Sequence, residues 1–260
     1  MGCSRGEGVM ELPVFYVRPE DVGDGILALR EEEVHHVRVL RLRPGDPIQT
    51  VDGRGQWFLA EIEKMADGVV WARPISEGKW VGEPEVRATL AVGLLKGERF
   101  DLLVEKTTEL GVHRIIPLIT KYAVRHSISP SRTERWRRIA RAAMKQCGRS
   151  WLPEVSEPIP LEKALGEMAD MELKLIAWER ERNRGLREVL PEHKVRSVGV
   201  LVGPEGGFTE EEVASARKAG FIPLSLGPRR LRSETAGILA LGFLMHAWEE
   251  PRPDAETGDG

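Results

Sequence analysis

The feature that most constrains this chain is a pair of glycine-containing loops near its C-terminal end. GPEGG occupies positions 203 to 207 after the apolar run VLV, and LGPRRLRSETAG occupies positions 226 to 237 after FIPLS. Each loop follows a strand-like run and opens a helical pattern, which is how an α/β sheet presents backbone groups to a small ligand. The pattern therefore predicts a ligand site that the rest of the chain supports.

The first loop excludes the two common nucleotide-phosphate motifs. Neither G-x-G-x-x-G nor G-x-x-x-x-G-K-[ST] is present at GPEGG. Glycines at a strand-to-helix turn are also simple turn formers, so GPEGG alone leaves a structural interpretation open. The second loop favours a ligand, because Arg229, Arg230, Arg232, Ser233 and Glu234 are concentrated directly before an apolar helix.

Length and composition place the chain among globular proteins. With 260 residues, 41% of them hydrophobic, it is long enough for two domains with buried cores. No apolar run approaches the ~18 residues of a membrane span, and the start lacks the order of a signal peptide. Gly6 stands where N-myristoylation needs Ser or Thr. Cys3 and Cys147 are too few for a disulfide framework or a zinc cage, so we expect a cytoplasmic protein without membrane or metal partners.

The net charge of −3 argues against nucleic-acid binding until its distribution is considered. Residues 249 to 260 hold five acids and one base in a tail that we expect to be disordered, and we expect the same of residues 1 to 12. The remainder is slightly basic, and its arginines are clustered, so local charge matters more than the total.

Residues 13 to 76 have the pattern of a small β-rich domain. Short apolar runs begin at Val14 and Ile26, and residues 47 to 75 hold three strand patterns separated by Asp-Gly turns. Several short strands at this spacing favour a small β-barrel. Between them, EEEVHHVRVL predicts a short helix whose adjacent histidines, His35 and His36, point about 100° apart and so do not form a metal pair.

Polar residues 77 to 86 predict a linker, and residues 87 to 248 predict an α/β domain. The apolar run from Ala88, the helical spacing that follows it and the next apolar run from His113 form a strand-helix-strand unit, which predicts a parallel sheet. The final helical pattern, from about Glu234 to Trp248, is apolar nearly all round. Such a helix must be buried, and it suits packing against a second copy of the chain.

The clearest helical pattern spans residues 129 to 148. Ser131 and Glu134 form a capping-box signature, and an apolar stripe runs to Cys147, which we interpret as a packing residue. A second capping box pairs Thr209 with Glu212. On the outer face of the first helix, cations between Arg132 and Lys145 greatly outnumber the single acid, which favours a phosphate-facing surface.

Six sequence blocks cover most of the chain from Val14 to Trp248: HHVRVLRLRPGD, DGRG, KGERFDLLVEKTTELGVHRIIPL, QCGRSWLPEV, LVGPEGGFTEEE and LGPRRLRSETA. Together they resemble the RsmE family of SPOUT-class, S-adenosylmethionine-dependent methyltransferases, which act on N3 of a uridine in small-subunit (16S) ribosomal RNA. The resemblance implies a PUA-like β-barrel, a SPOUT α/β domain whose parallel sheet is tied in a trefoil knot, and a homodimer. It also implies that the partner is small-subunit ribosomal RNA or the assembled small ribosomal subunit.

Methyl transfer to a ring nitrogen needs aligned reactants, exclusion of water and removal of the N3 proton or stabilisation of the resulting anion. Arg232 is the candidate for stabilising a uracil oxyanion or holding a phosphate, and Glu205 or Glu234 is the candidate base. Structural roles stay open for both acids, because Glu234 also suits a helix cap and Glu205 also suits ordering of its loop. The candidate residues for binding S-adenosylmethionine are Val202, Gly203, Pro204, Gly206, Gly207, Leu226, Gly227, Leu231 and Ala236.

The predicted RNA surface spans both domains, and phosphate contacts there would give salt-dependent affinity rather than sequence choice. Two alternatives stay open: a ribose 2′-O RNA methyltransferase of the same class, and a non-catalytic RNA-binding or ribosome assembly protein. The candidate RNA-binding residues are Arg18, His36, Arg41, Lys96, Arg99, Arg125, Arg138 and Arg149.

Overall fold

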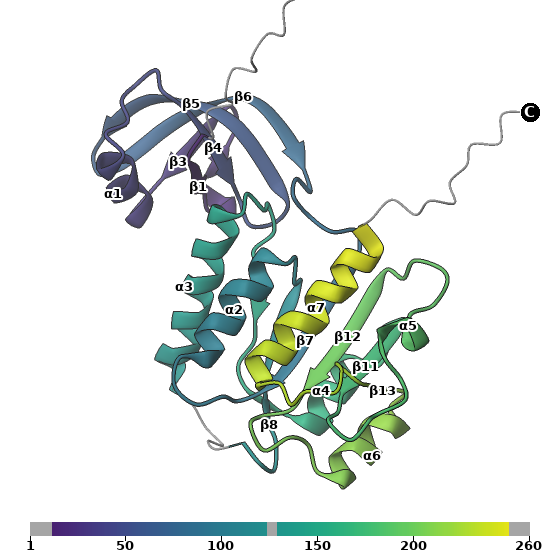
Figure 1. Cartoon of the computed structure of the whole chain (residues 1–260). Helices are drawn as coiled ribbons and strands as arrows, with labels where there is room; N and C mark the ends of the chain where they lie inside the picture. Colours follow the sequence, from purple (N-terminus) through teal and green to yellow (C-terminus); the bar gives the residue numbers. More distant parts are fainter. Residues whose placement is uncertain (1–11, 124–128, 250–260) are drawn as a thin grey trace, which may run out of the picture. The chain divides into compact units, whose positions relative to one another are not determined.

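The computed structural model describes residues 12–123 and 129–249, and the chain divides into two compact units (Figure 1). The small unit extends to Gly82 and also contains Gly148–Trp151, and the large unit contains the rest. Of the predicted disordered ends, residues 1–12 and 249–260, only residues 12 and 249 are among the described residues. The predicted RNA-binding residue Arg125 lies outside the described residues. Within those described ranges, none of the helices combines the length and the apolar content needed to cross a bilayer.

The small unit is a curled six-stranded sheet in the order β1-β4-β5-β6-β3-β2. Strands β1 and β4 pair in parallel and the other neighbours are antiparallel. The predicted strands and the short helix are confirmed. Their bounds are β1 Val14–Tyr16, a 3-10 turn at Pro19–Asp21, β2 Val22–Gly23, β3 Ile26–Leu29, α1 Glu32–Val39, β4 Pro47–Val51, β5 Gln56–Ala66 and β6 Val69–Lys79.

Alternation along β5 shows why this sheet forms. Phe58, Ala60 and Ile62 are buried at every second position, as expected of a strand with one face on a core. Asp67 and Gly68 both have positive φ, 52° and 74°, which is the backbone of a tight hairpin turn between β5 and β6. The last residues of β6 still pair with β5, so the polar segment that follows residue 76 begins as strand.

Segment Gly148–Trp151 joins this unit from a distant part of the sequence, which the sequence pattern does not reveal. The backbone N–H of Ser150 donates to Val81 O at 3.1 Å, and the N–H of Gly55 donates to Ser150 O at 3.0 Å. The Ser150 hydroxyl also donates to Val81 O at 2.9 Å. The small unit therefore closes over the loop after β4 with residues that follow the arginine-rich helix.

The large unit confirms the predicted α/β class with a parallel sheet. Its strand path is β10-β8-β7-β12-β11-β13, with β9 also paired to β8, and every pairing is parallel. The trefoil knot implied by the resemblance stays a prediction. The strand bounds are β7 Arg87–Gly93, β8 Arg114–Ile119, β9 Glu154–Val155, β10 Ile159–Pro160, β11 Leu173–Ala177, β12 Ser197–Val202 and β13 Ile222–Leu224.

Helices cover both faces of this sheet, which explains its continuous apolar strands. Residues of α2, α3, α5 and α7 pack in one buried cluster, and residues of α4 and α6 pack in another on the opposite face. Helices α2 and α7 lie side by side (Figure 1). The bounds are α2 Arg99–Glu109, α3 Pro130–Gln146, α4 Leu161–Glu167, α5 Leu186–Val189, α6 Glu210–Lys218 and α7 Ser233–Glu249.

Of the two predicted capping boxes, one is confirmed and one is wrong. At α6, Glu212 N donates to Thr209 Oγ1 at 3.2 Å and Thr209 N donates to Glu212 Oε2 at 2.8 Å. Helix α3 instead begins at Pro130, with Ser129 as its N-cap, so Ser131 lies inside the first turn. Proline occupies the first helical position readily because its φ is already helical and its missing N–H is not needed there.

Strand register aligns the carboxyl ends of four neighbouring strands. Val202 at the end of β12 is opposite both Val92 of β7 and Ala177 of β11, and Ala177 is opposite Leu224 of β13. The loops that follow these strands therefore leave the sheet at one edge, where parallel α/β sheets bind ligands.

Close approach of β7 to the first glycine loop gives a stability prediction. A Cβ at Gly93 would lie 2.5 Å from the backbone N of Pro204, whereas a Cβ at Gly199 would meet the flexible end of Met168 at 2.5 Å. We expect Gly93→Ala to lower the free energy of unfolding by about 1–3 kcal/mol, and Gly199→Ala by clearly less, because only a side-chain end can move aside. Urea unfolding of both variants checks this, and equal losses would contradict it.

Candidate functional site

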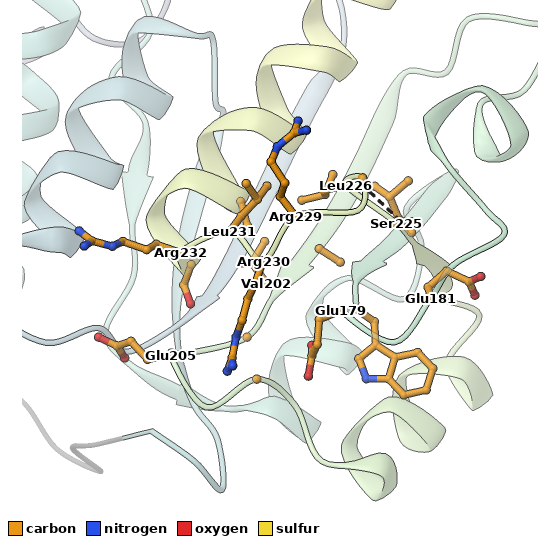
Figure 2. A pocket seen from close by; sticks show the side chains of 18 of the residues that line it. Glu179, Glu181, Val202, Glu205, Ser225, Leu226, Arg229, Arg230, Leu231 and Arg232 are labelled. Carbon is orange, nitrogen blue, oxygen red and sulfur yellow. Dashed lines mark hydrogen bonds between the residues drawn. The ribbon is translucent and has the colours of Figure 1, made fainter.

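A cavity of about 630 Å³ lies at this edge of the sheet (Figure 2). Its volume is within the range of about 300–1,000 Å³ that small-molecule sites occupy. Its walls come from the loops after β11, β12 and β13 and from the first turn of α7. The predicted cofactor residues that line it are Val202, Gly203, Pro204, Gly207, Leu226, Gly227, Leu231 and Ala236.

Glycines of the first loop permit its tight path. A Cβ at Gly203 would lie 2.9 Å from the carbonyl carbon of Gly207, so the loop folds back on itself. Gly207 has a φ of 73°, and a Cβ there would lie 2.8 Å from Glu179 Oε1. Gly206 differs from the other predicted residues, because it does not line the cavity and its Cβ position faces the side chain of Tyr122 at 2.8 Å. The cavity edge at Gly207 is thus kept open by the absence of a side chain.

Two further carboxylates that line the cavity are absent from the residues predicted from sequence. Glu179 and Glu181 line the cavity from the loop after β11 (Figure 2). The available signal was a pair of acids directly after the apolar run LKLIAW. One oxygen of Glu181 accepts backbone N–H groups from the next three residues, at 3.0, 2.9 and 3.3 Å. These N–H groups, that of Asn183 first, lower the pKa of Glu181 below its usual range.

The two predicted catalytic acids, Glu205 and Glu234, both contact Arg99. Glu205 Oε1 accepts the backbone N–H of Lys96 at 3.0 Å and lies 3.3 Å from Arg99 Nη1. Glu234 Oε1 lies 3.8 Å from Arg99 Nε, and its side chain is only 7% exposed. Arg99 therefore belongs to the cavity wall, and its RNA contact stays a prediction.

The second carboxylate oxygen of each acid is buried. Among the described residues, Oε2 of Glu205 and Oε2 of Glu234 have no hydrogen-bond partner. Glu205 lines the cavity, whereas Glu234 lies behind the lining in the first turn of α7. An acid at that helix end is also favoured by the helix dipole, so the structure gives Glu234 a structural role as well.

Three arginines of the second loop supply positive charge to the cavity. Arg229, Arg230 and Arg232 all line it and are exposed. None of them pairs with an acid in the part of the chain that the structure describes. Their side chains point in different directions, with Arg232 extending away from the Glu179 wall (Figure 2). This is an arrangement that can receive an anionic partner from several sides.

The predicted RNA-contacting residues of the large unit differ in their surroundings. Lys96 and Arg138 are exposed, as a phosphate contact requires. Other cations of α3 are already paired: Arg135 contacts Asp101 at 2.7 Å, and Arg137 pairs with Glu134. The arginine-rich face of α3 is therefore partly neutralised by acids of the same unit.

In the small unit, Arg41 is exposed and adopts a φ of 57°. Arg18 is 42% exposed and pairs with Glu31 at 2.5 Å, and the His36 ring packs against Phe15 with centroids 5.0 Å apart. Arg149 is only 2% exposed. This burial does not fit a solvent-facing phosphate contact for Arg149.

Two family models match the chain, an RNA methyltransferase domain over residues 82–245 and an RNA methyltransferase PUA domain over residues 29–74. This chain belongs to the RNA methyltransferase family. Ribosomal RNA small subunit methyltransferase E of Synechocystis is 35% identical over 86% of this chain and 74% of its own length. The Bacillus subtilis protein of the same name is 31% identical over 86% of this chain and 91% of its own length.

Solved methyltransferase structures share the fold. Ribosomal RNA small subunit methyltransferase E of Neisseria gonorrhoeae, bound to S-adenosylmethionine, superposes with a TM-score of 0.82 at 33% identity, covering 91% of this chain and 98% of that one. A methyltransferase from Legionella pneumophila in complex with the same cofactor has a TM-score of 0.80 at 35% identity, with the same coverage of both chains. The resemblance to the RsmE family deduced from sequence blocks is thereby confirmed.

Because Arg99 lies beside both Glu205 and Glu234, we expect the protein to lose stability when the charge of Arg99 is removed. We expect Arg99→Gln to lower the free energy of unfolding by about 1–2 kcal/mol, because buried Glu234 loses its counter-charge. The loss stays below that of a fully buried pair because Arg99 is 39% exposed and water screens it. The control is Arg196→Gln, which removes a pair whose arginine is 92% exposed, and it should change stability little. Equal effects of the two variants would refute the assignment.

Glu181 predicts a pH dependence. Its pKa in the folded protein lies below the usual 4.5, so its stabilising effect is complete above that pH and is lost as the pH falls through the lowered value. Glu181→Gln should therefore be less stable than the parent protein at neutral pH, and the difference should shrink in acid. Urea unfolding of both proteins from pH 7 to below pH 4 measures this, and a constant difference would argue against the effect.

Proposed function

We propose that this protein transfers the methyl group of S-adenosylmethionine to N3 of a uridine in small-subunit ribosomal RNA. The observation that carries the proposal is the cavity at the strand ends, which holds a glycine loop and three arginines that pair with no acid among the described residues. Family membership supports methyl transfer to RNA, and the names of the relatives support small-subunit ribosomal RNA as the target. The N3 position rests on the resemblance to the RsmE family.

The cavity suits a cofactor that is cationic and partly apolar. Backbone at Gly203, Gly207 and Gly227 permits close approach, while Val202, Leu226, Leu231 and Ala236 supply apolar surface. Glu179 and Glu181 add negative charge on the wall after β11. S-adenosylmethionine supplies an electrophilic methyl group on a sulfonium when bound. Walls of this kind hold such a group away from bulk water, which protects it and strengthens local electrostatics.

The charged residues divide the remaining tasks. A uracil that loses its N3 proton carries negative charge on its ring and carbonyl oxygens, and Arg232 is our candidate for stabilising that charge. Glu205 is the better-placed base of the two acids, because it lines the cavity whereas Glu234 lies behind the lining. Arg229 and Arg230 would contact RNA phosphates near the reacting base.

Helix α7 supports a homodimer. It is apolar along its length, yet Phe243 is 43% exposed and Ile238, Leu239 and Gly242 are only partly buried. An apolar strip on a helix that also lines the cavity is suited to an isologous contact with a second copy. The small unit, matched as an RNA methyltransferase PUA domain, would add RNA contacts.

Transfer of labelled methyl groups from S-adenosylmethionine to small-subunit ribosomal RNA tests the proposed reaction. After digestion to nucleosides, we expect the label in N3-methyluridine. Label in a 2′-O-methylated nucleoside would favour the ribose methyltransferase alternative. Cofactor binding without transfer to any RNA or to assembled subunits would favour the assembly-protein alternative.

Arg232→Ala tests the role of this residue in the chemistry. We expect the methylation rate at saturating cofactor to fall by about 10²-fold, because a preorganised donor to the developing charge is lost. Cofactor affinity measured by calorimetry should remain close to that of the parent protein. Arg180→Ala, which removes an exposed cation outside the cavity lining, is the control. An unchanged rate in Arg232→Ala would remove it from the mechanism.

A further inference from the structure

A pair of tryptophans in the small unit has no role in the site described above. Trp80 and Trp151 are stacked, with ring centroids 5.6 Å apart and planes inclined by 28°. They are distant in sequence and meet because Gly148–Trp151 folds into this unit. Trp80 is 49% exposed, and Val81 beside it is 40% exposed. Large apolar side chains left this open on a soluble protein mark a surface that meets another molecule.

The backbone of Trp80 is held in a conformation that bulky residues rarely adopt. Its φ is 57°, in the left-handed region, which is strained for a residue other than glycine. The surrounding contacts impose it: Trp80 N donates to Gly55 O at 2.7 Å, and Val81 O accepts from both the backbone N–H and the hydroxyl of Ser150. Strain of this kind persists only where the structure over-determines it, and it gathers at binding sites.

The Trp80 ring packs against the backbone of Gly55. A Cβ at Gly55 would lie 3.0 Å from Trp80 Cε3, so the ring rests on the glycine backbone. The loop that carries Gly55 is fixed in turn, because Asp52 Oδ1 accepts the N–H groups of Arg54 and Gln56 at 2.7 and 2.9 Å. With Gly55 and Trp151 both against it, Trp80 is still 49% exposed, so part of its side chain stays open to solvent on a rigid platform.

The charge around this platform favours RNA as its occupant. Lys79 precedes Trp80, and Arg54 is bridged to Trp151 through the backbone; both side chains are exposed. Exposed aromatic rings beside cations bind single-stranded nucleic acid, because bases stack on the rings and phosphates meet the charges. A paired base within a duplex cannot stack in this way, since its faces are already covered by its neighbours.

We propose that Trp80 and Trp151 form a platform on which an unpaired base of the RNA substrate stacks. This rests on the proposed function, because it names a contact of the same RNA outside the methyl-transfer cavity. The stacked base is distinct from the uridine to be methylated. It would hold the RNA strand to the small unit while another nucleotide enters the cavity of the large unit.

The test compares binding of a short fluorescent oligouridylate with binding of a fully paired RNA duplex. Trp80→Leu keeps apolar volume but removes the aromatic face, and we expect it to weaken oligouridylate binding between about 5-fold and 100-fold. Trp80→Phe should retain most of the affinity. Duplex binding should change little in either variant. Trp71→Leu is the matched control, because Trp71 belongs to the same unit and contacts Lys64 rather than the platform.

Two further measurements keep the outcomes separable. Circular dichroism and calorimetry with S-adenosylmethionine establish that the variants are folded and that the large unit is intact. If Trp80→Leu binds oligouridylate like the parent protein while the parent methylates ribosomal RNA, the platform is overturned and the proposed function stands. If Trp80→Leu loses binding while the parent methylates no RNA, the platform is supported and the proposed function fails.

Discussion

The register of the parallel sheet is the constraint on which the rest of the large unit depends. Because Val92, Val202, Ala177 and Leu224 are mutually aligned, the loops after four strands leave the sheet at one edge. A one-residue slip in any of these pairings would move a loop and invert which side chains face each core. Apolar residues packed on both faces of the sheet hold this register. The same packing therefore positions the loops that form the cavity.

The close approaches at this edge explain the placement of glycine. Gly93 leaves room for Pro204, and Gly207 leaves room beside Glu179. A side chain at either position would press on backbone or close the cavity edge. The charged residues are then arranged by the same loops: Arg99 is shared by two acids on one side, while the arginines that follow β13 stay unpaired among the described residues. The cavity walls are therefore complementary in charge and polarity to a cationic, partly apolar cofactor and to an anionic RNA.

Sequence patterns were sufficient for the elements and for most of the cavity. Continuous apolar runs identified the buried strands, and the two glycine loops identified the site, because both signals are local. Glu179 and Glu181 were missed since acids after a strand are common, and only the register brings them to the same cavity as the glycine loop. The surroundings of Arg99 and Arg149 were not evident from the sequence for a related reason. A cation is expected at the surface from sequence alone, and only the fold places Arg99 in the cavity wall and leaves Arg149 2% exposed.

Binding of S-adenosylmethionine in this cavity is tested most directly by calorimetric titration of the cofactor into the parent protein and two matched variants. Ala236→Phe places a large side chain at a residue that lines the cavity, whereas Thr235→Phe places the same side chain at an adjacent exposed residue outside the lining. We expect one cofactor bound per chain in the parent protein and in Thr235→Phe, and loss of binding in Ala236→Phe. Absence of binding in the parent protein, or unchanged binding in Ala236→Phe, would contradict it.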